Sequence, residues 1–151
     1  MSDDFATINE WLVHLINEIW ELETKAIITD EFKDISNNDM HVIEAIGLGN
    51  GNNMSTIAKK LNITVGSLTT AMNSLVRKEY ATRRRGEDDR RVVFICLTEK
   101  GRQAYRHHED FHRLLTEGVM KQLNEEEMPV LIRALEGLTE FFHTYSEQNQ
   151  K

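Results

Sequence analysis

Apolar residues recur at helical spacing near both ends of the chain. Over residues 5–28 they lie three or four positions apart, and Trp11 and Trp20 widen the same stripe. A second stripe occupies residues 131–145, and Pro129 falls in the first turn of that predicted helix, where proline is tolerated. The pattern predicts two amphipathic helices whose apolar faces need partners.

Shorter elements are predicted between these ends. A helix capped by Ser36 or Asn37 runs through residue 46 and stops at the Gly- and Asn-rich GLGNGNN, which we expect to break regular structure. Residues 55–61 predict a short helix. A tight turn follows, and residues 64–78 predict a second helix that is capped by Thr64. Its buried stripe would consist of Val65, Leu68, Met72, Leu75 and Val76. Two short helices joined in this way form a helix-turn-helix pattern.

Strand-forming residues follow. The segments YATRRR and RRVVFICLT flank GEDD and predict a two-stranded hairpin with a charged tip. Thr98 caps a long helix, and Asn124 with Glu127 predicts a capping box for the last one. We therefore expect one mainly α domain with a small β-hairpin wing over residues 1–151. A winged helix-turn-helix lobe would span 36–102, and helices over 5–30 and 103–147 would pack together within one chain and between two.

Charge is distributed unevenly along the chain. The net charge is −7, yet residues 54–106 hold twelve Lys and Arg against five Asp and Glu, a local +7, which leaves −14 for the remainder. Five arginines fall within residues 83–91 alone. This asymmetry favours a lobe that binds a polyanion, whereas a purely structural helical dimer would leave the basic centre unexplained.

Other classes of protein find little support. The one cysteine, Cys96, excludes a disulfide within the chain and suits a reducing cytoplasm. No apolar stretch approaches the ~20 residues that span a bilayer, and the acidic start lacks a signal-peptide pattern. Phosphate-loop, nucleophile-elbow and metalloprotease motifs are absent from the sequence, so we expect a cytoplasmic protein that is not an enzyme.

The segment MSTIAKKLNITVGSLTTAMNSLVRKEYATRRRGEDDRRVVFICLTEKGR resembles the winged-helix core of the MarR family of bacterial transcription regulators. The DRR of residues 89–91, a strand, and then LTEKG are the most specific signature. FKDISNNDMHVIEAIG, TVGSLTTAMNSLVRK and RHHEDFHR look closest to the branch that represses fatty-acid biosynthesis in Firmicutes. The resemblance implies a homodimer with interlocked terminal helices, whose two lobes bind a pseudo-palindromic operator in double-stranded DNA.

The resemblance also assigns candidate DNA-binding residues. The helix over 65–78 would enter the major groove, and its exposed polar residues would contact bases and phosphates: Ser67, Thr69, Thr70, Asn73 and Arg77. Arg90 and Arg91 would enter the neighbouring minor groove. In the family, the residue at Asp89 orients a wing arginine through a charge-assisted bond. Phosphate contacts, or ion pairs at the base of the wing, are expected from Arg83, Arg84 and Arg85. The alternative for these arginines is a hairpin that only faces water.

The same branch implies a co-repressor, a long-chain acyl group carried on acyl carrier protein, with no bound cofactor. An acyl chain needs an apolar tunnel, and two predicted stripes supply candidates for its lining: Leu12, Leu15, Ile16 and Ile19 with Val42, Ile43 and Ile46. The alternative is that these side chains simply pack on one another. Because acyl carrier protein is acidic, it would dock on a basic patch.

Histidines raise a second possibility. His108 and His112 are four residues apart, a spacing that places both on one helical face and can hold a metal. A zinc-dependent regulator of the family resembles this arrangement, with ligands here at Glu23, His41, His108 and His112. Two alternatives for the histidines are hydrogen bonds across the hinge between the terminal helices and the lobe, and plain core or surface positions.

Overall fold

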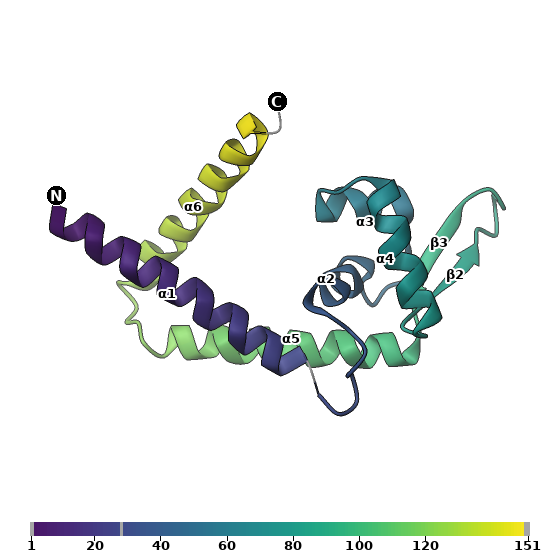
Figure 1. Cartoon of the computed structure of the whole chain (residues 1–151), viewed down its shortest axis with the longest axis horizontal. Coiled ribbons are helices and arrows are strands. Elements are labelled where there is room, and N and C mark those ends of the chain that lie inside the picture. The colour runs from purple at the N-terminus through teal and green to yellow at the C-terminus, as the bar shows by residue number, and fades with distance from the viewer. Residues whose placement is uncertain (1, 28, 150–151) are drawn as a thin grey trace. The chain divides into compact units, whose positions relative to one another are not determined.

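The computed structural model describes residues 2–27 and 29–149. Figure 1 shows the elements in chain order, which are α1 Ser2–Ile27, α2 Asn37–Ile46, β1 Asn52–Asn53, α3 Met54–Leu61, α4 Val65–Arg77, β2 Ala81–Arg85, β3 Val93–Leu97, α5 Glu99–Met120 and α6 Met128–Asn149. The expected fold class, mainly α with a β wing, is confirmed. The chain divides into two compact units within α5, after Phe111. None of the described helices is long and apolar enough to cross a membrane.

Side-chain caps fix the starts of the lobe helices. Ser36, one of the two predicted caps, starts α2 and forms a capping box with Asp39. Asn53 caps α3 by accepting from the backbone N–H of Thr56, and Thr64 caps α4 as predicted. The chain turns between α3 and α4 at Asn62, whose φ of 53° is left-handed. These local bonds satisfy N–H groups that a helix start leaves unpaired. The caps of α2 and α4 were predicted from the sequence, whereas Asn53, the cap of α3, was not.

The sheet has three strands in the order β1-β3-β2, one more than predicted. The prediction that GLGNGNN lacks regular structure is wrong at its end, because Asn52 pairs with Ile95 and Asn53 with Phe94. Gly51, with φ of 98°, makes this possible, since a Cβ there would lie 2.5 Å from Cys96 Sγ. Asparagine has little strand propensity, so β3 rather than local sequence creates this strand.

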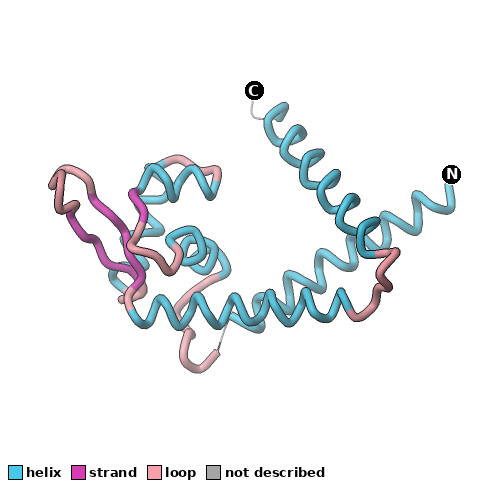
Figure 2. The backbone as a smooth tube through the Cα atoms, turned by 180° about the vertical axis from the view of Figure 1, so that it is seen from behind, coloured by secondary structure: helices cyan, strands magenta, loops and turns pink. Residues whose placement is uncertain are grey.

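One core fills the lobe between α2, α3, α4, the sheet and the start of α5. Its members are almost fully buried, and those contributed by α2, α4 and β3 include Val42, Ile43, Ile46, Leu68, Met72, Leu75, Ile95 and Leu97. Val65 is an exception, because its side chain is 45% exposed although we predicted it in the buried stripe. Figure 2 shows the strands β2 and β3 extending beyond these helices as a hairpin.

The second unit contains the end of α5 and all of α6. Asn124 and Glu127 form the predicted reciprocal bonds: Asn124 Oδ1 accepts from the Glu127 N–H, and Glu127 Oε2 accepts from the Asn124 N–H. The predicted stripe of α6 is present but lies in solvent, with Leu135, Phe141 and Phe142 more than half exposed. The unit therefore has an apolar face without a core.

Candidate nucleic-acid interface

The exposed face of α4 is the first half of the candidate interface. All five polar residues predicted to contact DNA lie exposed on it, namely Ser67, Thr69, Thr70, Asn73 and Arg77. Leu68, Met72 and Leu75 are fully buried on the opposite side, which fixes the rotation of the helix on the core. The structure thus presents these polar side chains together.

Three of these polar side chains already have partners. The Ser67 hydroxyl accepts from the Thr64 hydroxyl at 3.0 Å, and Thr69 Oγ1 donates to the Val65 carbonyl at 2.8 Å. Asn73 Oδ1 accepts from the Arg83 guanidinium, which joins α4 to β2. Sequence spacing does not predict this last contact, because the two residues lie on different elements.

The base of the wing contains the other arginines of β2. Arg84 donates to the Asn50 carbonyl at 3.1 Å, lies 3.8 Å from Glu87 and stacks over the Phe94 ring. Its hydrogen bond to Asn50 links the hairpin to the segment before β1, whereas its ion pair and ring contact lie within the hairpin. Arg85 is exposed at the end of the strand. The arginines predicted as one group therefore divide in the structure: Arg83 and Arg84 brace the wing, and Arg85 faces solvent.

Backbone bonds close the tip of the wing. The Gly86 N–H donates to the Val92 carbonyl, and the Val92 N–H donates to the Asp89 carbonyl. Asp89 Oδ1 accepts from the backbone N–H of Arg91 at 2.9 Å, rather than from an arginine side chain as the resemblance implied. Asp89 therefore shapes the turn that carries Arg91. Within residues 2–27 and 29–149, no carboxylate lies within ion-pair distance of Arg85, Arg90 or Arg91, whose charges face solvent.

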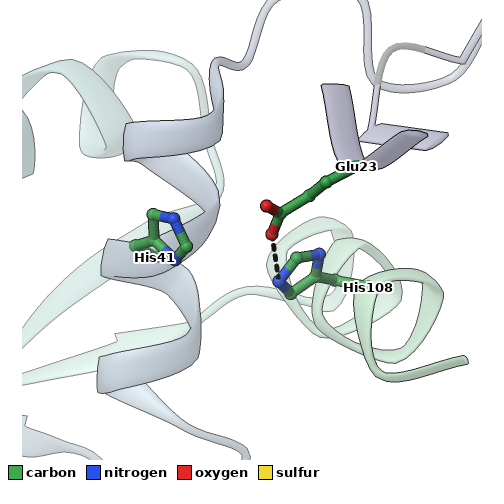
Figure 3. Close-up of side chains that lie close together, drawn as sticks. All are labelled: Glu23, His41 and His108. Atoms are coloured by element: carbon green, nitrogen blue, oxygen red, sulfur yellow. Dashed lines mark ion pairs between the residues drawn. The ribbon is translucent and has the colours of Figure 1, made fainter. Parts of the chain in front are cut away.

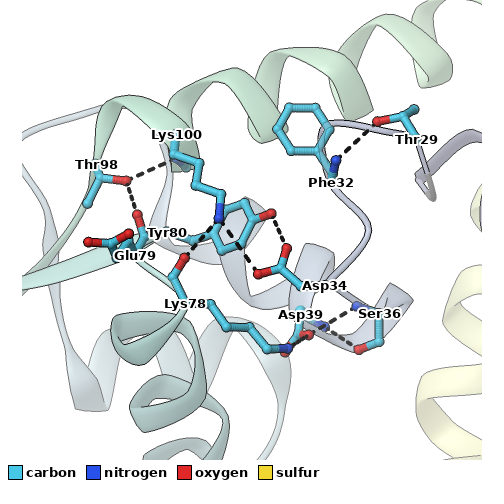
Figure 4. Close-up of polar contacts among 11 residues, drawn as sticks. Thr29, Phe32, Asp34, Ser36, Asp39, Lys78, Glu79, Tyr80, Thr98 and Lys100 are labelled. Atoms are coloured by element: carbon cyan, nitrogen blue, oxygen red, sulfur yellow. Dashed lines mark hydrogen bonds and ion pairs between the residues drawn. The ribbon is translucent and has the colours of Figure 1, made fainter.

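A polar cluster holds the end of α4 against the loop before α2 and the start of α5 (Figure 4). Lys78 Nζ lies 3.1 Å from Asp39 Oδ2, and the Tyr80 hydroxyl donates to Asp34 Oδ1 at 2.6 Å. Lys100 Nζ lies 4.2 Å from the centroid of the Tyr80 ring and donates to the Lys78 carbonyl. We name these five residues the clamp.

The clamp shifts the pKa of two of its members. The hydrogen bond from Tyr80 holds the pKa of the Asp34 carboxyl below its ordinary value, and the positive charge of Lys100 acts in the same direction. Burial raises the pKa of the Tyr80 phenol, and its bond to Asp34 raises it further. The native state therefore favours an ionised Asp34 beside a protonated Tyr80.

Comparison with known proteins agrees with this geometry. A profile of the transcriptional regulator family SarA/Rot matches residues 23–108. The chain belongs to this family of transcriptional regulators. Its winged helix-turn-helix fold is of the MarR type, as the crystal structure of Streptococcus pneumoniae FabT in complex with DNA illustrates, with 38% identity and a TM-score of 0.85 over 93% of this chain and 99% of that one.

Curated relatives are regulators as well. SarZ of Staphylococcus saprophyticus is 30% identical over 77% of this chain and 76% of its own length. PchR of Bacillus subtilis is 29% identical over 66% of this chain, and the match spans only 61% of that protein's length. Both are named as helix-turn-helix transcriptional regulators.

The residues proposed to line an acyl tunnel fall into two environments. Val42, Ile43 and Ile46 on α2 are buried in the lobe core. Leu12, Leu15 and Ile16 on α1 are exposed, and Ile19 is partly buried. The pockets on α6 and beside His41 have other linings. The tunnel thus stays a prediction.

Three of the four proposed metal ligands lie together in the first unit. Glu23 of α1, His41 of α2 and His108 of α5 point toward one another (Figure 3), and their ligand atoms lie within 4.8 Å of one another. His108 is buried, with Nε2 3.6 Å from Glu23 Oε1. The fourth predicted ligand, His112, lies on α5 in the second unit.

Sequence analysis missed a further carboxylate, that of Glu44. Its Oε2 lies 3.7 Å from His108 Nε2 and 3.8 Å from His41 Nδ1. The signal was its position three residues after His41, on the same face of α2. An open pocket of about 390 Å³ gives access to this side, lined by His41, Glu44, Ala45, Lys60 and Leu61.

His107 contacts α1 rather than the histidine cluster. Its Nε2 lies 2.6 Å from the Ala26 carbonyl, and its ring packs against Phe32. This contact ties α5 to the last turn of α1, where the first helix joins the lobe. This hydrogen bond joins the two predicted terminal helices to each other, so the proposed bond across the hinge to the lobe stays a prediction.

Proposed function

We propose that the chain is a sequence-specific DNA-binding repressor that acts as a homodimer on a pseudo-palindromic operator. The observation that carries the proposal is the pairing of an exposed polar face on α4 with solvent-facing arginines on the wing. A recognition helix in the major groove and arginines in the minor groove need these two features side by side. The likeness to a DNA-bound structure at 38% identity supports it.

A salt titration tests the DNA-binding step. Operator sequences are first selected with the full chain from randomised DNA duplexes. We expect the logarithm of the affinity to fall linearly and steeply with the logarithm of salt concentration, because several arginines release counterions from phosphates. An affinity that does not change between 50 and 200 mM salt, taken as roughly the range over which such complexes weaken strongly, would contradict the proposal.

For the regulatory step, we propose that a long-chain acyl group on acyl carrier protein acts as co-repressor for fatty-acid biosynthesis genes. The 38% identity with FabT supports this role, together with sequence resemblance to that branch. The exposed apolar residues Leu12, Leu15 and Ile16 of α1 and the α2 core residues are the proposed tunnel lining. The ligand would stabilise the dimer geometry in which the two recognition helices lie one DNA turn, ~34 Å, apart.

Band-shift titrations with three additives separate the possible effectors. We expect acyl carrier protein loaded with a long acyl chain to raise operator affinity, and the unloaded carrier to leave it unchanged. Zinc added to chelator-treated protein is the third arm. A hundredfold gain with zinc alone would replace the acyl proposal, and no gain with any carrier would remove it.

The cluster of Glu23, His41 and His108 favours a second candidate, a zinc-responsive repressor. Imidazole nitrogen and carboxylate oxygen are ligands that Zn²⁺ accepts, so the donor set fits. The three ligand atoms, within 4.8 Å of one another, need only a small approach to reach tetrahedral spacing. In this function the metal would hold α1, α2 and α5 together and so fix the attachment of the lobe.

Zinc binding by the chelator-treated protein tests this candidate directly. His41→Gln should weaken zinc binding strongly in a competition titration with a chromophoric chelator. His14→Gln, an exposed histidine elsewhere on α1, is the matched control and should bind as wild type does. Equal zinc affinities in all three proteins would eliminate the site.

A further inference from the structure

The start of the recognition helix exposes aliphatic side chains where polar ones would be expected. Val65 is the first residue of α4 and is 45% exposed, and Ile63, just before the cap, is 42% exposed. Neither joins the core of the lobe. A single exposed aliphatic side chain is ordinary, but this pair borders the face that we propose enters DNA.

The residue one turn further on extends this apolar edge. Thr69 lies four positions after Val65 and therefore on the same side of α4. Its hydroxyl donates to the Val65 carbonyl at 2.8 Å, so its proton is committed to the helix backbone. A threonine bound in this way offers its methyl group to a partner. Asn73, four positions further, is held by Arg83. This side of α4 therefore presents the methyl groups of Val65 and Thr69 first and the amide of Asn73 last.

The major groove contains one apolar group that such an edge can recognise. Thymine presents its C5-methyl there, whereas the other base edges present hydrogen-bond donors and acceptors. We propose that Val65, together with the Thr69 methyl, reads thymine C5-methyl groups in each half of the operator. This inference rests on the proposed DNA-binding function and adds a specificity determinant to it, beside the polar residues identified from sequence.

Continuity with the candidate interface favours DNA over a protein as the occupant. Val65 is followed on the same helix by Ser67 and Thr70, both exposed and polar. The surrounding segment, residues 54–106, also carries a net charge of +7 in a chain whose net charge is −7. A protein-docking face would be expected to continue as an apolar surface, as it does on α6.

Methyl deletion on the DNA tests the proposal. The probe is the operator duplex selected with the full chain, in which each thymine is replaced in turn by deoxyuridine, which lacks only the C5-methyl. We expect one or two thymines per half-site at which this change lowers wild-type affinity about fourfold, the effect of losing one buried methyl group. Val65→Ala should lose a similar amount on the thymine duplex and show no further loss on the uracil duplex.

A matched pair at Thr69 separates the methyl from the hydroxyl. Thr69→Val keeps the methyl and should keep the preference for thymine over uracil. Thr69→Ser keeps the hydroxyl and should reduce that preference. Thermal unfolding of each variant, expected to match wild type because both side chains are exposed, confirms that folding is unchanged.

The possible results distinguish a failure of this inference from a failure of the proposed DNA-binding function. If Val65→Ala binds both duplexes as wild type does, or loses equally on both, Val65 is not a methyl reader although salt-dependent DNA binding stands. If Val65→Ala changes self-association instead, the edge is a protein contact and the inference is wrong. If wild type selects no DNA from the randomised pool, the proposed function fails first, and this inference fails with it.

Discussion

The winged lobe and the terminal helices differ in how they bury apolar residues. In the lobe, Ile43, Leu68 and Leu75 are completely shielded by residues of the same chain. On α1, Phe5 and Trp11 are 75% and 64% exposed, and on α6 Phe141 is 59% exposed. Both regions have amphipathic helices, yet only the lobe supplies neighbours for them. The lobe has a buried core, to which Ile27 of α1 also contributes, whereas the exposed apolar residues of the terminal helices form the surface that the proposed dimer would cover.

This difference explains how the two tasks are divided. A closed core, with the clamp at its edge, holds α4 and the wing in a fixed relation, which base recognition requires. Helices with apolar faces can associate with those of a second copy and so set the separation of two lobes.

Disrupting the apolar face of α6 should have the largest effect. Phe142→Glu places a charge where the proposed dimer buries an aromatic ring that is 53% exposed in one chain. We expect light scattering to show monomers and operator affinity to fall about a hundredfold or more, since one lobe loses the effective concentration provided by the other. Lys121→Glu, in the turn after α5, is the control. A Phe142→Glu protein that stays dimeric would place the interface elsewhere.

Truncation within the lobe core should mainly affect folding. Leu75→Ala should lower the free energy of unfolding by about 2–5 kcal/mol, because the surrounding side chains cannot close the cavity. Urea denaturation at a fixed protein concentration measures this loss. Val65→Ala, on the same helix but exposed, should change stability by less than about 0.5 kcal/mol. Equal losses in the two variants would contradict the burial seen for α4.

Removing a solvent-facing arginine should weaken DNA binding without affecting either region's packing. Arg91→Ala should cost about 1–3 kcal/mol of operator affinity, with molar mass and thermal stability unchanged. Fluorescence anisotropy with selected operator DNA measures the change. Lys33→Ala, an exposed cation in the loop before α2, is the comparison and should bind normally. Unchanged affinity for Arg91→Ala would remove the wing from the interface.

The clamp should contribute the smallest and most pH-dependent effect. Tyr80→Phe removes the bond to Asp34 and should reduce stability by about 0.5–1.5 kcal/mol near neutral pH. Because the pKa of Asp34 is lowered in the folded state, this contribution is present above the unfolded value of about 3.9 and is lost as pH falls through the folded value. Urea titrations at several acidic pH values should therefore show the difference between wild type and variant shrinking. A constant difference would mean that Asp34 is not its source.

Local signals made most of the helices and caps predictable. Ser36, Thr64 and Thr98 accept hydrogen bonds from N–H groups three residues ahead, which is a matter of short sequence spacing. The polar face of α4 was equally readable, because helical period alone separates it from Leu68, Met72 and Leu75. The basic hairpin followed from its arginines and strand-forming residues.

Contacts between segments that are distant in the sequence could not be predicted from local spacing. The strand β1 exists because Gly51 lets the chain approach β3 closely, and Glu44 joins the histidine cluster because α1, α2 and α5 converge. Arg83 and Arg84 brace the wing because they contact Asn73 and Asn50, whereas Arg85 faces solvent. Val65 has the spacing of the buried stripe, but it is the first residue of α4 and its side chain lies outside the core.

The sequence by itself determined which segments are helical, where they begin, which faces are apolar and where positive charge gathers. These properties depend on residues within one or two turns of one another, and hydrogen bonding and side-chain period fix them locally. Tertiary structure alone decided which arginines face solvent, which carboxylates meet His108 and which aliphatic residues of α4 stay outside the core. Those outcomes depend on the distance between atoms that are far apart in the chain, and only the packed core sets that distance.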